Sequence, residues 1–375
     1  MKPRVLIASV STGAGHLRAA EAVEAALHIN HPNLKVMHVN AMHYVSKPFR
    51  RIYEDSYAFM VNRAPSLWAS VYGATDRRKN NPDSYSLLNS FQSLNASALF
   101  ECIERFEPHR ILTTHFFLPH ILSARIRARR FHVPLECVIT DFDLHRSWVD
   151  SCVSHYYVAR EKVAIKLVRE GINREKITVS GIPIHPDFLK ATDKSKILTK
   201  MGLHPHVPTL LVLSGGLGFG ALEKTVKHLL KLKSRVQIIT VAGKNEEKLK
   251  RLNALQPPSH ISLVNYGYVT NMAELIACSD MVVTKAGGLT ISECLAQGAA
   301  IIIYGSIPGQ EQKNSAYVKL KGAAVEAENV DDLLLKVQSF LEVPEVLHRF
   351  RHNARECGKP QAAFNVADSL ASHLH

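Results

Sequence analysis

The same local pattern occurs twice in this chain, and it restricts the fold more than any other feature. An apolar run at 4–10 leads through a Gly-containing turn into a helical pattern over 16–27. A second run at 209–213 leads through a Gly-rich turn into a helical pattern over 221–231. A buried strand followed by a tight turn and a helix is the opening unit of a βα arrangement. The sequence therefore predicts an α/β protein with two Rossmann-like, doubly wound halves.

Further apolar runs predict the remaining strands. They lie at 35–40, 110–114, 135–140, 156–159, 236–242, 261–266, 281–284 and 300–304. Strands that alternate with helices pair in parallel, so each half is expected to hold a parallel sheet covered on both faces.

The domain boundary is expected in a polar stretch. A chain of 375 residues is too long for one hydrophobic core, and the stretch between Ile184 and Val207 is polar and contains prolines. The sequence predicts an N-terminal domain over 1–190, a linker over 191–206 and a C-terminal domain over 207–347. A terminal helix is expected over 348–375.

Cysteine usage and hydropathy indicate the compartment. The six cysteines are scattered without CxxC or Cys/His spacing, which predicts a reduced, cytoplasmic protein without a structural metal. The first apolar run gives way to Ser, Thr and Gly, which favours a buried strand over a signal peptide. No window approaches the roughly 20 apolar residues of a membrane span, so any membrane contact is expected to be peripheral.

Positive charge is concentrated at 44–79, which raises the question of a negatively charged binding partner. The formal net charge is +13. The basic residues of the segment are Lys47, Arg50, Arg51, Arg63, Arg77, Arg78 and Lys79, and its aromatic residues are Tyr44, Phe49, Tyr53, Tyr57, Phe59, Trp68 and Tyr72. This combination suits an anionic bilayer surface. Nucleic acid is the competing partner, but no nucleic-acid-binding motif accompanies the charge; an incidental solvated face is the third alternative.

The segment 284–314 has the groups that a nucleotide-diphosphate-sugar requires. The turn Ala286, Gly287, Gly288 runs into Thr290 at a predicted helix start, where backbone N–H groups and the helix dipole favour a diphosphate. Glu293, one turn later, can accept both hydroxyls of a ribose. The alternative for Glu293 is an ordinary carboxylate that the helix dipole stabilises.

A second turn, at 308–311, follows the next apolar strand. Its Gln310 and Glu311 suit the hydroxyls of a hexose, with Asn314 and Lys285 as further candidates for the sugar. A polar surface turn without a ligand is the alternative.

The Gly-rich turn at 214–220 is a weaker signal. Close backbone approach to a diphosphate is reasonable for Ser214, Gly215, Gly216 and Gly218. The pattern also fits the dinucleotide fingerprint loosely, but the acidic residue expected about 20 positions later is missing. A plain tight turn is the third alternative.

These segments together resemble glycosyltransferase family 28. Within it they are similar to the monogalactosyldiacylglycerol synthases and diacylglycerol glucosyltransferases. The resemblance extends to four further segments: STGAGH (11–16), TDFDLHRSW (140–148), SGIPIHPDF (180–188) and SGGLGFG (214–220).

The resemblance implies a GT-B fold, in which two Rossmann-like domains face a cleft and the terminal helix crosses back to the N-terminal domain. It also implies an inverting transferase that moves a hexose from a UDP-sugar to the 3-hydroxyl of diacylglycerol. No metal or other cofactor is expected. The sequence does not choose among glucose, galactose and glucuronate and predicts no oligomeric state. Transfer to a polyprenyl-diphosphate lipid, a UDP-sugar epimerase or hydrolase, and a non-catalytic UDP-sugar-binding protein are the alternatives.

The resemblance also implies roles for single residues. Backbone groups at Val269 would pair with uracil. His16, at the start of the first helix, would be the base or would orient the acceptor, with Asp141 as its support. The acceptor side would further include Thr12, Gly13, Gly15 and Trp148. A capping role for His16 and a metal-binding role for the 141–143 Asp-x-Asp pair are the alternatives.

Overall fold

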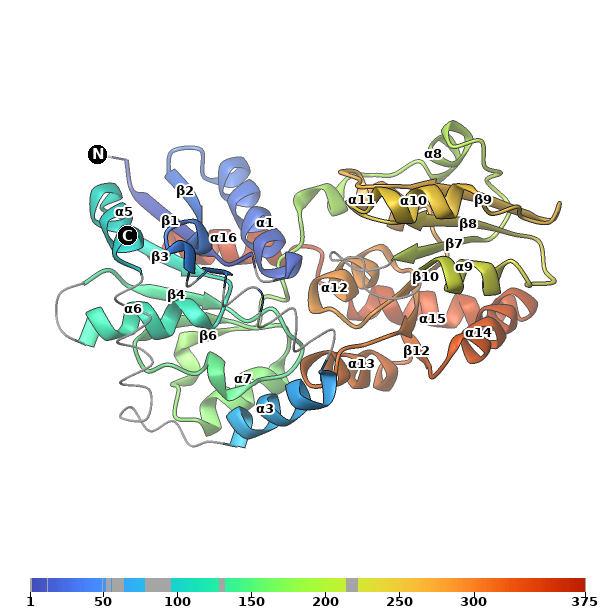
Figure 1. Cartoon of the computed structure of the whole chain (residues 1–375). Coiled ribbons are helices and arrows are strands. Elements are labelled where there is room, and N and C mark those ends of the chain that lie inside the picture. Colours follow the sequence, from blue (N-terminus) through green and yellow to red (C-terminus); the bar gives the residue numbers. More distant parts are fainter. Residues whose placement is uncertain are drawn as a thin grey trace. The chain divides into compact units, whose positions relative to one another are not determined.

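The computed structural model describes residues 2–11, 13–48, 50–51, 55, 64–77, 96–127, 132–213 and 222–374. The chain divides into two compact units (Figure 1). The first unit comprises Met1–Pro186, Pro308–Gln310 and Gln361–His375, and the second comprises Asp187–Ile307 and Glu311–Pro360.

The first unit is built on a six-stranded parallel sheet with the order β2-β1-β3-β4-β5-β6. Its strands are β1 (Arg4–Ser9), β2 (Lys35–Asn40), β3 (Arg110–Thr113), β4 (Leu135–Val138), β5 (Val153–Tyr157) and β6 (Ile177–Thr178). The chain adds β2 on one side of β1 and β3 on the other. The point between β1 and β3 is therefore the topological switch point, where ligands of such sheets bind.

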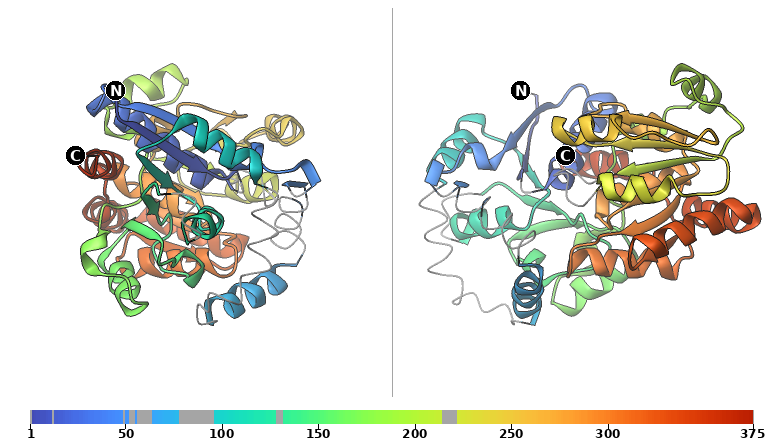
Figure 2. Two further views of the ribbon diagram at one scale, coloured as in Figure 1. Left: turned by 90° about the vertical axis from the view of Figure 1, so that its left-hand side faces the viewer. Right: turned by 45° about the vertical axis from the view of Figure 1, so that its right-hand side comes forward.

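Helices cover both faces of this sheet. On one face, α1 (Ala14–Asn30) and α16 (Ala362–Ser372) share a core cluster with Val5 and Ile7 of β1. On the other face, α5 (Ser97–Phe106), α6 (Phe117–Arg127) and α7 (Glu161–Arg169) share a cluster with Leu6 and Ala8. Because successive strand residues point to opposite faces, a sheet buried on both sides needs uninterrupted apolar strands. Figures 1 and 2 show α16 beside α1, although most of the first unit and the whole second unit lie between them in sequence.

Short elements complete the first unit. They are α3 (Pro65–Arg77) and the 3-10 helices η1 (Ala41–His43), η3 (Arg146–Trp148), η4 (Arg174–Lys176) and η5 (Pro186–Leu189), the last of which runs into the second unit.

The second unit also holds a six-stranded parallel sheet, with the order β12-β11-β10-β7-β8-β9. Its strands are β7 (Thr209–Leu213), β8 (Val236–Val241), β9 (Ile261–Tyr266), β10 (Met281–Thr284), β11 (Ala300–Tyr304) and β12 (Ala324–Ala327). Its helices are α8 (Lys194–Lys200), α9 (Leu222–Leu229), α10 (Glu246–Asn253), α11 (Met272–Ala277), α12 (Gly288–Gln297), α13 (Gln310–Leu320), α14 (Val330–Glu342) and α15 (Pro344–Cys357). Here the switch point lies between β7 and β10.

The predicted α/β class with two doubly wound sheets is confirmed. Two strands were not predicted, β6 and β12, because the first has only two residues and the second, AVEA, is interrupted by a glutamate. The strand expected at 156–159 begins earlier, at Val153, and ends at Tyr157.

Two further expectations differ from the structure. The helix expected over 348–375 is two helices, α15 and α16, since Gly358 and Pro360 interrupt the helical pattern. The expected linker at 191–206 contains α8, which belongs to the second unit and contacts α11.

Candidate active site

Three neighbouring strands of the first unit deliver polar groups to its switch point. His16 follows β1, Thr114 and His115 follow β3, and Thr140 follows β4. Because the strands are parallel, the residues that follow them gather at one edge of the sheet.

The ring of His16 is held in one tautomer. Its Nδ1 donates to the carbonyl oxygen of Thr114 at 2.7 Å and lies 3.0 Å from the hydroxyl of Thr140. A carbonyl only accepts hydrogen bonds, so Nδ1 carries the proton and Nε2 carries the lone pair. Thr114 also donates its hydroxyl to the main-chain carbonyl of His16, at 2.8 Å.

Burial keeps this ring neutral. Desolvation lowers the pKa of His16 from 6.5 to about 4, and the opposing effect of the Thr114 hydrogen bond is smaller. Burial is thus the largest cause of the low pKa of His16. At neutral pH, Nε2 of His16 is therefore ready to accept a proton.

The carboxylate of Asp141, the expected support of His16, acts on the phenol of Tyr72. Burial raises the pKa of the Tyr72 phenol, and the carboxylate of Asp141 raises it further. Asp143 accepts from Lys166 Nζ at 2.6 Å and from the Leu144 amide at 2.9 Å. Support of His16 by Asp141 thus stays a prediction.

Aromatic rings form a wall beside His16. The ring of His115 meets that of His16 edge-on, with centroids 4.5 Å apart, and Trp148 lies 6.1 Å from His16. Phe116 stacks on His115 at 4.3 Å and contacts Trp148 at 5.8 Å. Trp148, predicted on the acceptor side, is buried in this wall. Sequence analysis missed His115 because it belongs to no motif.

The glycines of the first loop lie at the start of α1. Gly13 is the residue before the helix and has φ 89°, a conformation that favours glycine. Gly15 is the second residue of the helix, and Thr12 lies outside the described residues.

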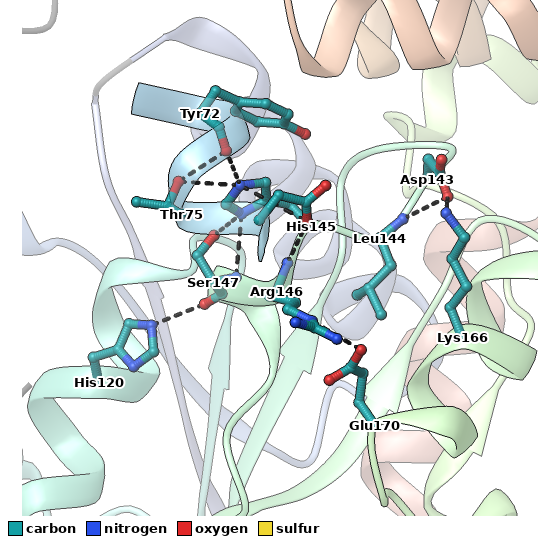
Figure 3. Close-up of polar contacts among 11 residues, drawn as sticks. Tyr72, Thr75, His120, Asp143, Leu144, His145, Arg146, Ser147, Lys166 and Glu170 are labelled. Carbon is teal, nitrogen blue, oxygen red and sulfur yellow. Dashed lines mark hydrogen bonds and ion pairs between the residues drawn. The ribbon is translucent and has the colours of Figure 1, made fainter. Parts of the chain in front are cut away.

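The segment that carries Trp148 is fastened to α3 (Figure 3). His145 donates from Nε2 to the carbonyl of Tyr72 at 3.0 Å, and its Nδ1 accepts from the amide of Ser147 at 3.1 Å. His120 donates to the carbonyl of Ser147 at 2.8 Å. These bonds fix η3 and hence the position of the Trp148 ring.

A cavity of about 470 Å³ lies beside this network. It is lined by Asp76, Leu144, Arg146, Lys166, Arg169 and Glu170. Arg146 pairs with Glu170 at 3.0 Å, and its amide donates to Asp76 at 3.1 Å. Because cations and carboxylates pair across it, its lining selects neither an anion nor a cation.

The second unit presents a helix start at its switch point. The loop after β7 holds Ser214, Gly215, Gly216 and Gly218, all of which lie outside the described residues. After β10, α12 begins at Gly288, and no described side chain caps it. Its first N–H groups therefore lack intrahelical partners and can bind an anion.

The other predicted UDP residues lie on or near these elements. Thr290 and Glu293 are partly exposed positions of α12, and Val269 lies in the loop between β9 and α11. Burial raises the pKa of the Cys294 thiol, and the adjacent Glu293 carboxylate adds to the effect.

Three of the four residues expected to hold the sugar, Lys285, Glu311 and Asn314, make hydrogen bonds within the second unit. Glu311 accepts from Lys285 Nζ at 2.6 Å and from the amide of Ile307 at 2.8 Å. Asn314, fully buried, donates to the carbonyl of Ala286 at 3.1 Å. These contacts fasten α13 to the loop before α12. The Gln310 side chain, by contrast, makes no hydrogen bond to any described residue.

Two further observations concern the described ranges. Within them, no three His, Cys, Asp or Glu side chains come together as a metal site. None of the helices there is both long and apolar enough to cross a bilayer.

Comparison with known proteins finds matching family models and similar proteins. The chain matches the family model of monogalactosyldiacylglycerol synthase over residues 16–184 and that of the glycosyltransferase family 28 C-terminal domain over residues 209–345. It is 30% identical over 360 residues to a processive diacylglycerol beta-glucosyltransferase of Bacillus subtilis (strain 168), covering 94% of this chain and 91% of that protein. It is 26% identical to the chloroplastic monogalactosyldiacylglycerol synthase of Spinacia oleracea, covering 98% of this chain and 72% of that protein.

Solved structures share the fold at lower identity. MurG of Acinetobacter baumannii superposes with a TM-score of 0.65 at 14% identity, covering 99% of both chains. The UDP-GlcNAc 2-epimerase of Neisseria meningitidis, bound to UDP-GlcNAc, has a TM-score of 0.63 at 13% identity, covering 99% of this chain and 100% of that one.

Proposed function

Because the chain belongs to glycosyltransferase family 28, in the branch of the diacylglycerol glucosyltransferases and monogalactosyldiacylglycerol synthases, we propose that it moves a hexose from a UDP-sugar to the 3-hydroxyl of diacylglycerol. The observation that carries the proposal is the fixed tautomer of His16, which leaves Nε2 as a proton acceptor.

The acceptor reacts at His16. Its hydroxyl gives a proton to Nε2 as the oxygen attacks C1 of the sugar, and the bond between C1 and the diphosphate breaks with its electron pair leaving on UDP. A single displacement of this kind inverts the configuration at C1. Asp141 would stabilise the imidazolium that forms.

The donor binds the second unit. The start of α12 at Ala286, Gly287, Gly288 and Thr290 and the turn with Ser214, Gly215, Gly216 and Gly218 would hold the diphosphate, Glu293 the ribose, and backbone groups at Val269 the uracil. Gln310 would contact the sugar, together with the Lys285–Glu311 pair and Asn314. The N–H groups and the helix dipole would stabilise the charge on departing UDP, so no metal is required.

We further propose that the protein docks peripherally on the inner face of the cell membrane. Of the segment 44–79, residues 49, 52–54, 56–63 and 78–79 lie outside the described residues, as do the side chains of Trp68 and Arg77. Among the residues of this segment that the structure describes, Arg51 is exposed. Reversing Arg50, Arg51, Arg77 and Arg78 to Glu should abolish co-sedimentation with phosphatidylglycerol liposomes without changing UDP affinity. Equal binding to neutral liposomes would contradict electrostatic docking.

Product analysis tests the reaction. The protein is incubated with radiolabelled UDP-glucose, UDP-galactose or UDP-glucuronate and diacylglycerol liposomes, and the lipids are separated by chromatography. A glycosyl-diacylglycerol is expected. Labelling only of a polyprenyl-diphosphate lipid, or conversion of the UDP-sugar without lipid, would favour the lipid II-type transferase or the epimerase and hydrolase alternatives.

His16→Ala should lower turnover about 100-fold or more, while calorimetry shows unchanged UDP binding.

A further inference from the structure

His115 is a second histidine at the switch point of the first unit, and the proposed reaction does not use it. It is the second residue after β3, is only 3% exposed, and its ring meets the ring of His16 edge-on with centroids 4.5 Å apart. Any acceptor that reaches Nε2 of His16 therefore comes close to His115.

The hydrogen bonds of His115 define its tautomer. Its Nδ1 accepts from the amide of Phe117 at 3.1 Å. An amide N–H only donates, so Nδ1 carries the lone pair and Nε2 carries the proton. Burial lowers the pKa of His115 well below 6.5, and the neighbouring His16 and His120 lower it further. The ring is therefore neutral and offers one donor, Nε2–H.

This donor is available to a ligand. Among the described residues, His115 Nε2 has no hydrogen-bond partner. The only fully enclosed side-chain polar atom without a partner in that part of the chain is Ser123 Oγ. Nε2 of His115 thus reaches the molecular surface with its proton unused.

The two rings present complementary groups side by side. His16 offers an acceptor and His115 offers a donor. In diacylglycerol, the carbon that bears the reactive hydroxyl is bonded to a carbon that bears an ester. The hydroxyl, which donates a hydrogen bond, therefore lies next to an ester carbonyl, which only accepts one. The donor of His115 does not suit the hydroxyl oxygen itself, since that oxygen needs its lone pair to attack C1 of the sugar.

We propose that His115 Nε2–H binds the ester carbonyl next to the reacting hydroxyl and so makes the enzyme select ester-linked over ether-linked glycerolipids. This inference rests on the proposed function. Phe116 and Trp148 would then lie along the start of the acyl chains, since both pack in the same wall.

Matched lipids test the inference. Transfer is measured to a diacylglycerol and to the dialkylglycerol with the same chains, which lacks both carbonyls, in otherwise identical liposomes. The wild-type enzyme should prefer the ester by about 2–13-fold in kcat/KM, the value of one hydrogen bond. His115→Phe should lose this preference by slowing transfer to the ester alone. His115→Gln, which keeps an N–H donor, should retain part of it.

The controls separate the possible failures. His132→Gln changes an exposed histidine of the same unit and should keep the wild-type preference. UDP affinity and the unfolding temperature report whether each variant is folded. Equal transfer to both lipids by the wild type, or an unchanged preference in a folded His115→Phe, would overturn the role of His115. Absence of transfer to either lipid by the wild type would overturn the proposed function as well.

Discussion

At the scale of single residues, the carbonyl of Thr114 decides which nitrogen of His16 takes a proton. A carboxylate in its place would favour the imidazolium through its charge. The neutral carbonyl orients the ring but leaves the effect of burial dominant, so the pKa of His16 stays low. The ring is a weak base that is unprotonated over a wide pH range.

This low pKa predicts the pH dependence of turnover. A base works only in its unprotonated form, and the pKa of His16 falls from 6.5 to about 4. Turnover at saturating substrates should therefore persist as pH falls from 6.5 to about 5 and decline only below that. Initial rates with liposome substrate across this range are the measurement. A half-maximal point at or above pH 6.5 would argue against His16 as the base.

Glu293 offers a prediction on the donor side. Glu293→Ala should weaken UDP binding by about 1–3 kcal/mol, because a charged acceptor of the ribose hydroxyls is lost. Glu246→Ala is the matched control, since Glu246 is an exposed carboxylate in the first turn of α10. Calorimetry that finds the same UDP affinity in Glu293→Ala as in the wild type would contradict a ribose-binding role for Glu293.

Gln310→Ala should leave the affinity for UDP unchanged and weaken only the binding of the UDP-sugar, as measured by calorimetry with both ligands.

At the scale of elements, His145 joins α3 to the segment that carries Trp148. Its two ring nitrogens bond to main-chain groups of Tyr72 and Ser147, and its ring lies 4.2 Å from that of Tyr72. The position of α3 therefore depends on a side chain about 70 residues away in sequence. Because α3 lies in the proposed membrane-docking segment, the same contact connects that segment to the aromatic wall.

Removal of His145 should loosen both elements. His145→Ala removes the hydrogen bonds from His145 to the Tyr72 carbonyl and from the Ser147 amide to His145, at about 0.5–1.5 kcal/mol each. Hydrogen exchange at 65–77 and 145–148 should accelerate, while UDP affinity stays unchanged. His132→Ala, at an exposed site of the same unit, should leave the exchange unaltered. Unchanged exchange in His145→Ala would mean that other contacts hold α3.

At the scale of the whole molecule, the first unit is completed by the last helix. Leu370 and Val366 of α16 are fully buried against a cluster that includes Val23 and Leu27 of α1. Alanines on both helices allow their backbones to approach closely. The core of the first unit thus depends on residues that follow the second unit in sequence.

A core substitution in α16 should therefore destabilise the first unit. Leu370→Ala should lower its free energy of unfolding by about 2–5 kcal/mol, whereas Ile29→Ala, at a 59% exposed site of α1, should change it by at most about 0.5 kcal/mol. Both tryptophans of the chain, Trp68 and Trp148, belong to the first unit, so their fluorescence reports its unfolding in denaturant. Equal denaturant midpoints for Leu370→Ala and Ile29→Ala would contradict a stabilising role of α16 in the first unit.

The parts of the fold that were predictable are those with a local pattern. Strands such as β7 and β11 are continuous apolar runs because both faces of the sheet are buried. β6 and β12 escaped prediction because an edge strand of a few residues needs no such run. The break between α15 and α16 rests on Gly358 and Pro360, whose effect depends on where the following helix packs.

The candidate site was predictable in its motifs but not in its contacts. Glycine-rich turns after strands identified His16 and the start of α12. The Thr114 carbonyl leaves no side-chain signature, and the Lys285–Glu311 pair joins residues 26 positions apart. His115 becomes visible only when β1 and β3 are known to be neighbours.

The place of α16 also has a consequence for synthesis on the ribosome. The roughly 190 residues that separate Pro186 from the end of α16 take about 10–40 s to translate at about 5–20 residues per second. During that time the nascent first unit lacks the helix that covers α1, and the apolar side chains of α1 that pack against α16 face solvent or other chains. Substitutions in α16 should therefore reduce the yield of protein made at high expression rates before they reduce the activity of the molecules that fold. Pulse-labelled nascent chains should stay protease-sensitive in α1 until α16 emerges; early protection would show that the first unit closes without it.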